Sequence, residues 1–303
     1  MKRQNILYSA VMSALLSLVV TVSFSQNIQP IEGPGSHYKT FSTLNAQPNP
    51  ERAWMDTIRF PWTEYSGFAL ASTLMRTVYL GSEDEAKLPT LVTFPANSSD
   101  QTRAELDYLL TLQSNRTKEE IARAEFIGNI GSWPTILNPT DTGYANNLAQ
   151  LFYIATPVGK WFNYQNFPAA ARLLLNCIQD IRVTEFRLKK QFRRARPYHL
   201  EPKLQPLARM SSPSFASGHS LWAFTQAFLF SEIIPDKRAD FIKMAEEVRW
   251  SRELMGIHYP SDNEASRIIA WNLLKAWSKN PQFKIDLNNA KKEWTEKRLM
   301  SAK

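Results

Sequence analysis

Cysteine is almost absent from this chain of 303 residues, in which Cys177 is the only one. One cysteine cannot close an intramolecular disulfide, so no such bond can staple the fold. The thiol lies in the apolar run LLLNCI, which predicts that it is buried and unreactive. A chain of this length can instead bury a sizeable hydrophobic core, and one or two domains are expected.

Metal-binding patterns and strand patterns are scarce as well. The chain has four histidines, and neither acidic ligand clusters nor His/Cys metal spacings are evident. TLVTF at residues 90–94 is the one segment that suggests a strand. From about residue 65 onward apolar residues recur at helical spacing, which predicts an all-α fold in one domain with ten or fewer helices.

Capping residues and prolines place several helix boundaries. Ser98 with Gln101, and Thr117 with Glu120, stand at the spacing of a capping box. One long helix is expected to begin after Pro168 and to end close to Arg196, which precedes a proline. Another helix should stop before Pro235, and three more are expected in residues 237–257, 263–280 and 285–299.

Long apolar runs are missing except near the N-terminus. Residues 6–24 are apolar, basic residues precede them, and Ser23 and Ser25 are the small residues that a signal peptidase reads. The pattern predicts a secretory signal at residues 1–25 that is cut after Ser25, with an uncleaved membrane anchor as the alternative. The protein is therefore expected in the periplasm or secreted, with no stable membrane insertion after cleavage.

The rest of the chain is basic and opens with an irregular segment. Residues 26–64 are rich in Pro, Gly, Ser and Asn, which predicts an extended N-terminal arm before a helical domain at 65–303. The formal net charge is +8, and removing residues 1–25, with two basic residues and no acid, lowers it to +6. Such a surface favours anionic small molecules, nucleic acids or membranes without selecting one.

The first cluster that carries chemistry is KKQFRRARPY, which contains Lys189, Arg196 and Pro197. Lys189 and Arg196 are seven residues, about two helical turns, apart, so both can lie on one face of the predicted helix. The helix should end at the proline, which places both cations at one helix end. By itself the run is also typical of a solvated basic face.

The second cluster, SFASGHS, contains Ser217, Gly218 and His219 and leads into an apolar helix. Gly218 permits close approach to the backbone, and the unpaired N–H groups of a helix start form an anion site. The Ser217 hydroxyl and the His219 imidazole border that site. An ordinary Ser/Gly helix start with a capping histidine is the alternative interpretation.

The third cluster, SRELMGIHYPSD, contains Arg252, His258 and Asp262. Pro260 predicts a helix break just after His258, so Asp262 stays close enough to contact one imidazole nitrogen. A carboxylate there fixes the tautomer and leaves the other nitrogen free as a nucleophile or base. Arg252 adds a planar guanidinium suited to phosphate oxygens. A buried histidine satisfied by a neighbouring acid is the alternative.

Together the clusters supply three cations, two histidines, a hydroxyl, a helix N-terminus and one carboxylate. Phosphoryl transfer requires a similar set, because its transition state spreads negative charge over three equatorial oxygens with the attacking and leaving atoms in line. Fixed arginine and lysine side chains can neutralise this charge in place of a metal ion.

The joint spacing resembles the three-part signature of the type 2 phosphatidic acid phosphatase superfamily, which includes the vanadium haloperoxidases. That signature reads Lys189, six residues, Arg196-Pro197; Ser217-Gly218-His219; and Ser251-Arg252, five residues, His258, three residues, Asp262. HYPSD and the export signal are most similar to the bacterial class A non-specific acid phosphatases, and the resemblance covers roughly residues 85–296. It implies a single-domain helical bundle of the superfamily's type.

The resemblance also implies a role for each residue. His258 is expected to attack phosphorus and form a phosphohistidine, Asp262 to orient it, and His219 to protonate the leaving alkoxide. The groups expected to bind phosphate oxygens are Lys189, Arg196, Arg252, the Ser217 hydroxyl and the Gly218 N–H. The implied protein is an exported acid phosphatase that hydrolyses small phosphate monoesters without a metal or other cofactor. No nucleic acid partner is expected, and a homo-oligomer stays open.

Two positions depart from the family pattern. Ala216 stands where a proline usually precedes Ser-Gly-His, so the loop lacks a fixed φ, but no catalytic group is lost. Ser266 stands where a glycine is common, in a segment to which the sequence assigns no chemical role. Neither change predicts an inactive protein.

Other functions stay open at this point. The same site could hold vanadate covalently on His258 and oxidise halides, as a vanadate-dependent haloperoxidase; otherwise vanadate is expected to inhibit. A lipid-phosphate or pyrophosphate phosphatase is a further alternative. The basic helix RLKKQFRRAR could bind nucleic acid or anionic lipid without catalysis, although a carboxylate-paired His258 has no purpose there. The loops around residues 135–165 are expected to select the substrate.

Overall fold

The structure, a computed structural model, describes residues 35, 37–131 and 133–301. The predicted signal peptide at 1–25 and the start of the arm lie outside the described residues. Within those residues there is no strand, which confirms the predicted all-α class. The prediction of a strand at residues 90–94 is wrong, because the first two of these residues belong to a 3-10 helix. The described residues contain eleven α-helices, one more than predicted.

The α-helices in chain order are α1 (Gly67–Ser72), α2 (Ser82–Lys87), α3 (Asp100–Asn115), α4 (Lys118–Gly128), α5 (Tyr144–Gln150), α6 (Pro168–Phe192), α7 (Pro197–Leu200), α8 (Gly218–Ile233), α9 (Arg238–Leu254), α10 (Pro260–Trp277) and α11 (Pro281–Ser301). The 3-10 helices are η1 (Phe41–Thr43), η2 (Pro50–Thr57), η3 (Trp62–Glu64), η4 (Leu88–Leu91), η5 (Tyr153–Val158) and η6 (Pro235–Lys237).

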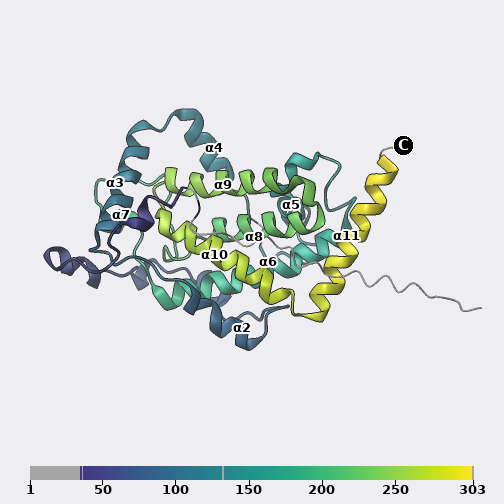
Figure 1. The fold of residues 1–303 in the computed structure, drawn as a ribbon, viewed down its shortest axis with the longest axis horizontal. Coiled ribbons are helices and arrows are strands. Elements are labelled where there is room, and N and C mark those ends of the chain that lie inside the picture. The colour runs from purple at the N-terminus through teal and green to yellow at the C-terminus, as the bar shows by residue number, and fades with distance from the viewer. Residues whose placement is uncertain (1–34, 36, 132, 302–303) are drawn as a thin grey trace, which may run out of the picture. The chain divides into compact units, whose positions relative to one another are not determined.

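Helix α8 is buried on every side. It contacts α6, α9, α10 and α11, and Figure 1 shows it between α9 and α10. Leu221, Trp222 and Phe224 are among its fully buried side chains. A helix that is apolar all round must be enclosed, so its neighbours hold its first turn at a fixed position. None of the helices in the described ranges is long and apolar enough to cross a bilayer.

The segment predicted as an extended arm is folded where the structure describes it. The short helices η1, η2 and η3 interrupt it. Asn97 Nδ2 donates to the Met55 and Ile58 carbonyls at 2.9 and 3.0 Å. The Phe60 N–H donates to the Arg193 carbonyl at 2.9 Å. The segment therefore packs on the helices and covers the turn that follows α6.

The long helix ends earlier than predicted. Helix α6 stops at Phe192, and Arg193 caps it in the left-handed conformation with φ 46°. Arg196 lies beyond this turn, in extended backbone just before α7. The prediction that Lys189 and Arg196 share one helix face is therefore wrong. The turn after α6, and not helical spacing, brings Arg196 back toward Lys189.

The two capping predictions had different outcomes. Thr117 and Glu120 form the predicted capping box at the start of α4. Helix α3 begins one residue later than predicted, because the Ser99 hydroxyl accepts from the Thr102 N–H at 3.1 Å. Ser98 is engaged elsewhere, since its hydroxyl donates to Asp56 at 2.6 Å.

Candidate active site

The three sequence clusters meet around the first turn of α8. Lys189 comes from the end of α6, Arg196 from the turn before α7, and the third cluster from the junction of α9 and α10. All of the predicted site residues are buried except His219, which is partly exposed. The predicted phosphate-binding residues together form the cradle, which consists of Lys189, Arg196, Ser217, Gly218 and Arg252.

His258 is held between a carboxylate and a guanidinium. Its Nδ1 lies 3.1 Å from Oδ2 of Asp262, and its Nε2 lies 2.9 Å from Nη1 of Arg196. An ionised carboxylate only accepts hydrogen bonds and a guanidinium only donates them. The proton therefore belongs on Nδ1 and the lone pair on Nε2. Asp262 follows His258 by four residues, in the first turn of α10, which brings its carboxylate back to the ring.

The surroundings favour a neutral ring beside an ionised acid. Burial and the charge of Arg196 lower the pKa of His258 well below its ordinary value, against the opposing effect of Asp262. Burial alone would raise the pKa of Asp262, but Arg194 and the hydrogen bond from His258 bring it below its ordinary range. The imidazole therefore keeps its Nε2 lone pair at acidic pH.

Two residues that sequence reasoning missed hold Asp262 from its other side. Arg194 Nη1 donates to Oδ1 of Asp262 at 2.7 Å, and the Ser214 hydroxyl donates to Oδ2. The Arg194 guanidinium also lies 3.9 Å from the centre of the Tyr259 ring. The contacts fix the carboxylate that orients His258. Arg194 was visible in the run RRARP, whereas no pattern marks Ser214.

A second buried acid, Glu105 of α3, lies beyond Arg194. Its carboxylate accepts from the Ser261 N–H at 2.9 Å and from the Ser261 hydroxyl at 2.8 Å. Its Oε2 lies 3.6 Å from Nη2 of Arg194. Burial raises the pKa of Glu105 to about 7, against the effect of Arg194. These contacts tie α3 to the turn of α10 that carries Asp262.

Backbone carbonyls hold the three predicted cations in place. Arg196 Nε and Lys189 Nζ donate to carbonyls of residues 212 and 213 at 2.9 and 2.6 Å. Arg252 Nη2 donates to the Ala124 carbonyl at 2.9 Å. A carbonyl carries no net charge, so it positions each cation without neutralising it. The positive charges are therefore preorganised for an oxyanion.

Burial affects the lysine and the arginines differently. Burial, with the charge of Arg196, lowers the pKa of Lys189 to about 7. Burial lowers the pKa of Arg252 to about 10, so that guanidinium stays charged at neutral pH. An oxyanion in the cradle favours the protonated lysine. Its binding is therefore expected to weaken as the pH rises through about 7.

His219 is the second residue of α8 and faces the end of α4. Its Nε2 lies 3.2 Å from the Gly128 carbonyl, and because a carbonyl only accepts, Nε2 carries the proton. Burial, followed by the charges of Arg252 and Arg182, lowers the pKa of His219 well below its ordinary value. A second proton on the ring is therefore disfavoured until a negatively charged group lies beside it.

Ser217 caps α8, and Ser266 ties this cap to α10. The Ser217 hydroxyl accepts from the Ser220 N–H, and Ala216, in place of the usual proline, is fully buried beside it. The Ser266 hydroxyl lies 2.8 Å from the Ser217 carbonyl and 2.9 Å from the Asp262 carbonyl. Ser266, which the sequence left without a role, therefore helps to position the second cluster against the third.

Arg182 and Glu185 are two further buried charges that sequence reasoning did not select. They form an ion pair with 2.8 Å between Arg182 Nη1 and Glu185 Oε2, and Glu185 precedes Lys189 by one turn of α6. The helical spacing of the three charged residues was visible in the sequence. Their burial was not, because charged runs on helices are usually exposed.

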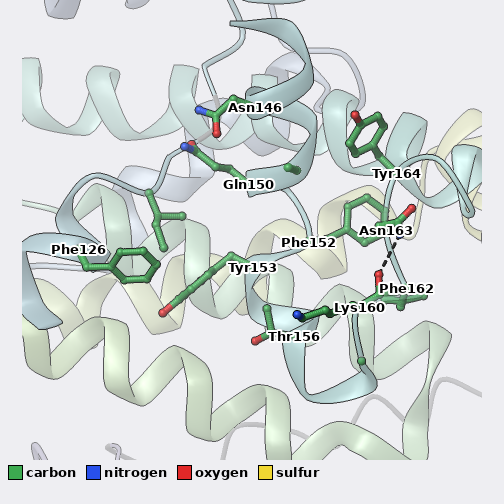
Figure 2. A pocket seen from close by; sticks show the side chains of 13 residues that line it. Phe126, Asn146, Gln150, Phe152, Tyr153, Thr156, Lys160, Phe162, Asn163 and Tyr164 are labelled. Carbon is green, nitrogen blue, oxygen red and sulfur yellow. Dashed lines mark hydrogen bonds between the residues drawn. The ribbon is translucent and has the colours of Figure 1, made fainter.

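A pocket of about 600 Å³ adjoins the segment that contacts His219 (Figure 2). Phe126 lines the pocket and stands two residues before Gly128, whose carbonyl contacts His219. Tyr153 lines it as well, and most of the other lining residues lie between 146 and 164. This stretch falls within the region that the sequence suggested for substrate selection.

Comparison with known proteins agrees with the motif. The profile of the PAP2 superfamily matches residues 169–286, which include every predicted site residue. A non-specific acid phosphatase of Providencia stuartii is 28% identical over 165 residues, 51% of this chain and 62% of that protein. An acid phosphatase of Zymomonas mobilis is 28% identical over 131 residues, 40% of this chain and 49% of that protein. The chain thus spans less than two thirds of these curated relatives.

Two solved structures are also similar. A bacterial vanadium-dependent iodoperoxidase matches with a TM-score of 0.50 and 16% identity, covering 80% of this chain and 64% of the other, which shows a likeness of fold alone. A transmembrane PAP2-type phosphatidylglycerolphosphate phosphatase of Bacillus subtilis matches with a TM-score of 0.43 and 19% identity. The match covers 70% of this chain and 94% of the other. Residues 169–286, which contain the three converging clusters, are thus similar to the PAP2 superfamily.

Proposed function

We propose that this protein is an exported acid phosphatase that hydrolyses phosphate monoesters through a phosphohistidine, without a metal ion. One observation carries the proposal, namely the His258 ring with Nδ1 at Asp262 (3.1 Å) and Nε2 at Arg196 (2.9 Å). The two relatives named as acid phosphatases support it. Export rests on the predicted signal at residues 1–25, and the periplasm or the medium is the expected location.

In the first step the phosphoryl group leaves the ester. The Nε2 lone pair of His258 attacks phosphorus, and the bond between phosphorus and the ester oxygen breaks. His219, protonated once the anionic substrate lies beside it, donates a proton to the departing alkoxide. The products are the alcohol and a phosphohistidine, with Asp262 stabilising the positive ring.

In the second step water releases phosphate. The neutral His219 left by the first step accepts a proton from water, whose oxygen attacks phosphorus. The bond between phosphorus and Nε2 breaks, and its electron pair returns to His258. Inorganic phosphate leaves, and both histidines are ready for another cycle.

Fixed positive charges stabilise both transition states. Lys189, Arg196 and Arg252 would bind the equatorial oxygens, with the Ser217 hydroxyl and the Gly218 N–H. Among the described residues, no group of three or more His, Cys, Asp or Glu side chains is placed to hold a metal ion. The proposed steps use only the two histidines, Asp262 and the cradle residues. Vanadate resembles the five-coordinate phosphorus and should inhibit at the same place.

The test is phosphate release from an aryl phosphate by the purified protein. The unaltered protein should turn over and should resist a metal chelator. His258→Ala should lower kcat by roughly 10³-fold or more, because the nucleophile is gone. Protein quenched in alkali during turnover should carry one added phosphoryl group, and His258→Ala should carry none.

A matched control is His37→Asn, because His37 is a histidine outside the cradle that pairs with Glu253 at 2.9 Å. It should retain turnover. Equal turnover by His258→Ala and the unaltered protein would exclude the proposed nucleophile. Bound vanadium with halide-dependent peroxidase activity, and no phosphate release, would favour the haloperoxidase alternative instead.

A further inference from the structure

Glu185 is a buried acid that the proposed chemistry does not use. Its side chain projects from α6 one turn before Lys189 and is only 8% exposed. Oε2 accepts from Arg182 at 2.8 Å, and Oε1 lies 4.0 Å from Nζ of Lys189. The carboxylate is thus fixed among the cations that are meant to receive an anion.

The carboxylate also lies against Gly218, the first residue of α8. A Cβ built on Gly218 would overlap Glu185 Oε1, Oε2 and the carbon that joins them. The missing side chain of Gly218 therefore makes room for an acid at the start of α8. The first N–H groups of a helix have no acceptor within the helix, so the same place suits an oxyanion.

An acid at an oxyanion site discriminates by protonation. A carboxylate repels an oxygen that carries only lone pairs, but it accepts a hydrogen bond from an oxygen that carries a proton. A phosphate monoester has a second pKa of about 6, so it keeps one O–H at acidic pH. A sulfonate or sulfate has no proton to donate at any pH near neutral.

We propose that Glu185 determines specificity in the cradle: its carboxylate selects oxyanions that carry a proton, as phosphate monoester monoanions do, against unprotonated ones. The proposal deepens the phosphatase assignment and rests on it for the placement of the phosphoryl group beside Gly218. It also gives a second physical reason, besides protonation of His219, for activity in acid.

Other charged and titratable groups face Glu185, and their effects on anion binding must be distinguished from the effect of Glu185. Arg182 and Lys189 face it from α6, and Arg196 from the turn before α7. Tyr65, from the segment before α1, also senses its charge. Lys189 loses its proton as the pH rises through about 7, and this loss of charge will weaken the binding of every anion. The comparison must therefore use matched anions at one pH and a variant that keeps Lys189.

Methylphosphonate and methanesulfonate are suitable probes. Neither is hydrolysed, because carbon replaces the ester oxygen, and the two have the same tetrahedral shape. At pH 5.5 both carry a single negative charge, and only the phosphonate has an O–H. Direct titration calorimetry on the full protein gives the ratio of their dissociation constants without any turnover.

The unaltered protein should bind methylphosphonate at least about tenfold more tightly than methanesulfonate at pH 5.5, a difference of roughly 1.4 kcal/mol. Glu185→Gln should bring the two affinities within about threefold, mainly by tighter sulfonate binding, because the amide can donate to an unprotonated oxygen. The same ratio in Glu185→Gln and the unaltered protein would overturn the proposal.

Glu264→Gln is the matched control. Glu264 also forms a buried pair with an arginine three residues away, with 2.6 Å between Arg267 Nη2 and Oε1, but it lies outside the cradle. It should leave the ratio unchanged. A ratio that falls equally in both variants would show a general effect of losing a buried acid and would count against Glu185.

A pH series on the unaltered protein decides the matter if Glu185→Gln folds poorly. Above its second ionisation methylphosphonate gains a charge and loses its O–H. Attraction to the cations alone would raise its affinity relative to methanesulfonate, whereas Glu185 should lower it. A relative rise contradicts the proposal. A collapsed ratio in Glu185→Gln with no phosphate release in the unaltered protein would leave oxyanion selection standing and remove the phosphatase assignment.

Discussion

The cradle is buried and charged, while the pocket beside it is partly exposed and lined by both aromatic and polar side chains. Lys189, Arg196 and Arg252 are each 1% exposed, whereas Phe126 at the pocket is 53% exposed. Carbonyl oxygens fix each cation, so a small displacement would leave a buried charge without its partner. Phe126 can therefore be replaced at little cost to the fold, whereas a buried ring of the pocket such as Phe152 cannot.

Hydrogen bonding follows the same division. Asp262 accepts from the side chains of His258, Arg194 and Ser214 and from the Tyr259 N–H. The pocket combines single hydrogen bonds, such as the one from Asn163 Nδ2 to the Lys160 carbonyl, with packed rings such as Phe152 and Phe162, whose centroids lie 5.3 Å apart. Substitutions in the two regions should therefore differ in both the size and the kind of their effects.

Loss of the Asp262 charge should give the largest effect after loss of the nucleophile. In Asp262→Asn the amide cannot stabilise a positive His258 ring, and kcat should fall by roughly 10³- to 10⁴-fold. Arg194 would also lose the nearer of its two buried acids and keep only Glu105 at 3.6 Å, which should lower the free energy of unfolding by up to about 3–5 kcal/mol. Turnover of an aryl phosphate and urea unfolding measure the two effects.

Asp286→Asn is the control for Asp262→Asn, because Asp286 is a buried acid that accepts from the Tyr79 hydroxyl at 2.6 Å, away from the cradle. It should cost stability and leave kcat unchanged. A kcat within tenfold of normal in Asp262→Asn would show that the carboxylate does not support the reaction.

Replacing one cradle cation by another should have the next largest effect. Arg252→Lys keeps the charge but loses the donors to Ser251 (3.0 Å) and Ala124 (2.9 Å), together with the planar fork. We expect kcat/KM to fall by about 10- to 100-fold. Arg249→Lys, on the same helix but paired with Glu253, should change it less than threefold. Similar losses in both variants would assign Arg252 a merely structural role.

The pH profile of kcat/KM should show that the buried site favours acid. His219 must be protonated to act, and its pKa lies below the ordinary value, so the alkaline limb should begin below pH of about 6.5. His258 must be neutral, and its lowered pKa moves the acidic limb to lower pH. Activity at pH 7.5 should be about tenfold or more below its maximum. An alkaline limb that starts above pH 7.5 would contradict the assignment of His219.

His219→Asn separates two protein groups, His219 and Lys189, whose loss of a proton lowers activity on the alkaline side. Its residual activity should still decline near pH 7, where Lys189 loses its proton. The remaining limb should then respond to Lys189→Arg, which stays charged. A residual profile that is flat across neutral pH would show that Lys189 does not titrate in the working protein.

The meeting of the three clusters could be predicted from sequence, because the chemistry expected of them restricts the residue types at each position. Histidine, arginine and an acid at fixed spacing leave few alternatives, and helical periodicity placed most of the helices that carry them. The turn after α6 could not be predicted, because its left-handed residue is Arg193, where a glycine would have been the usual signal.

Buried acids were also beyond sequence reasoning. Glu105 and Glu185 stand on helices among other charged residues, and such positions are usually exposed. Only the tertiary structure shows that Glu105 meets Arg194 and Ser261, and that Glu185 meets Arg182 and Gly218. The segment before α1 poses the same difficulty. Its proline-rich sequence excludes a long helix, but it does not indicate which helices the segment packs against.

The smallest expected effect comes from the pocket and sharpens its contrast with the cradle. Phe126→Ala removes a ring from the pocket wall and should raise KM for an aryl phosphate by about fivefold, roughly 1 kcal/mol, if the aryl group packs on that ring. The value of kcat should stay within about twofold, because the ring contacts no reacting atom. Methyl phosphate is too small to reach it, so its kinetics should not change. A fall in kcat on both substrates would mean that Phe126 positions Gly128 and His219, and that the pocket wall belongs to the catalytic support.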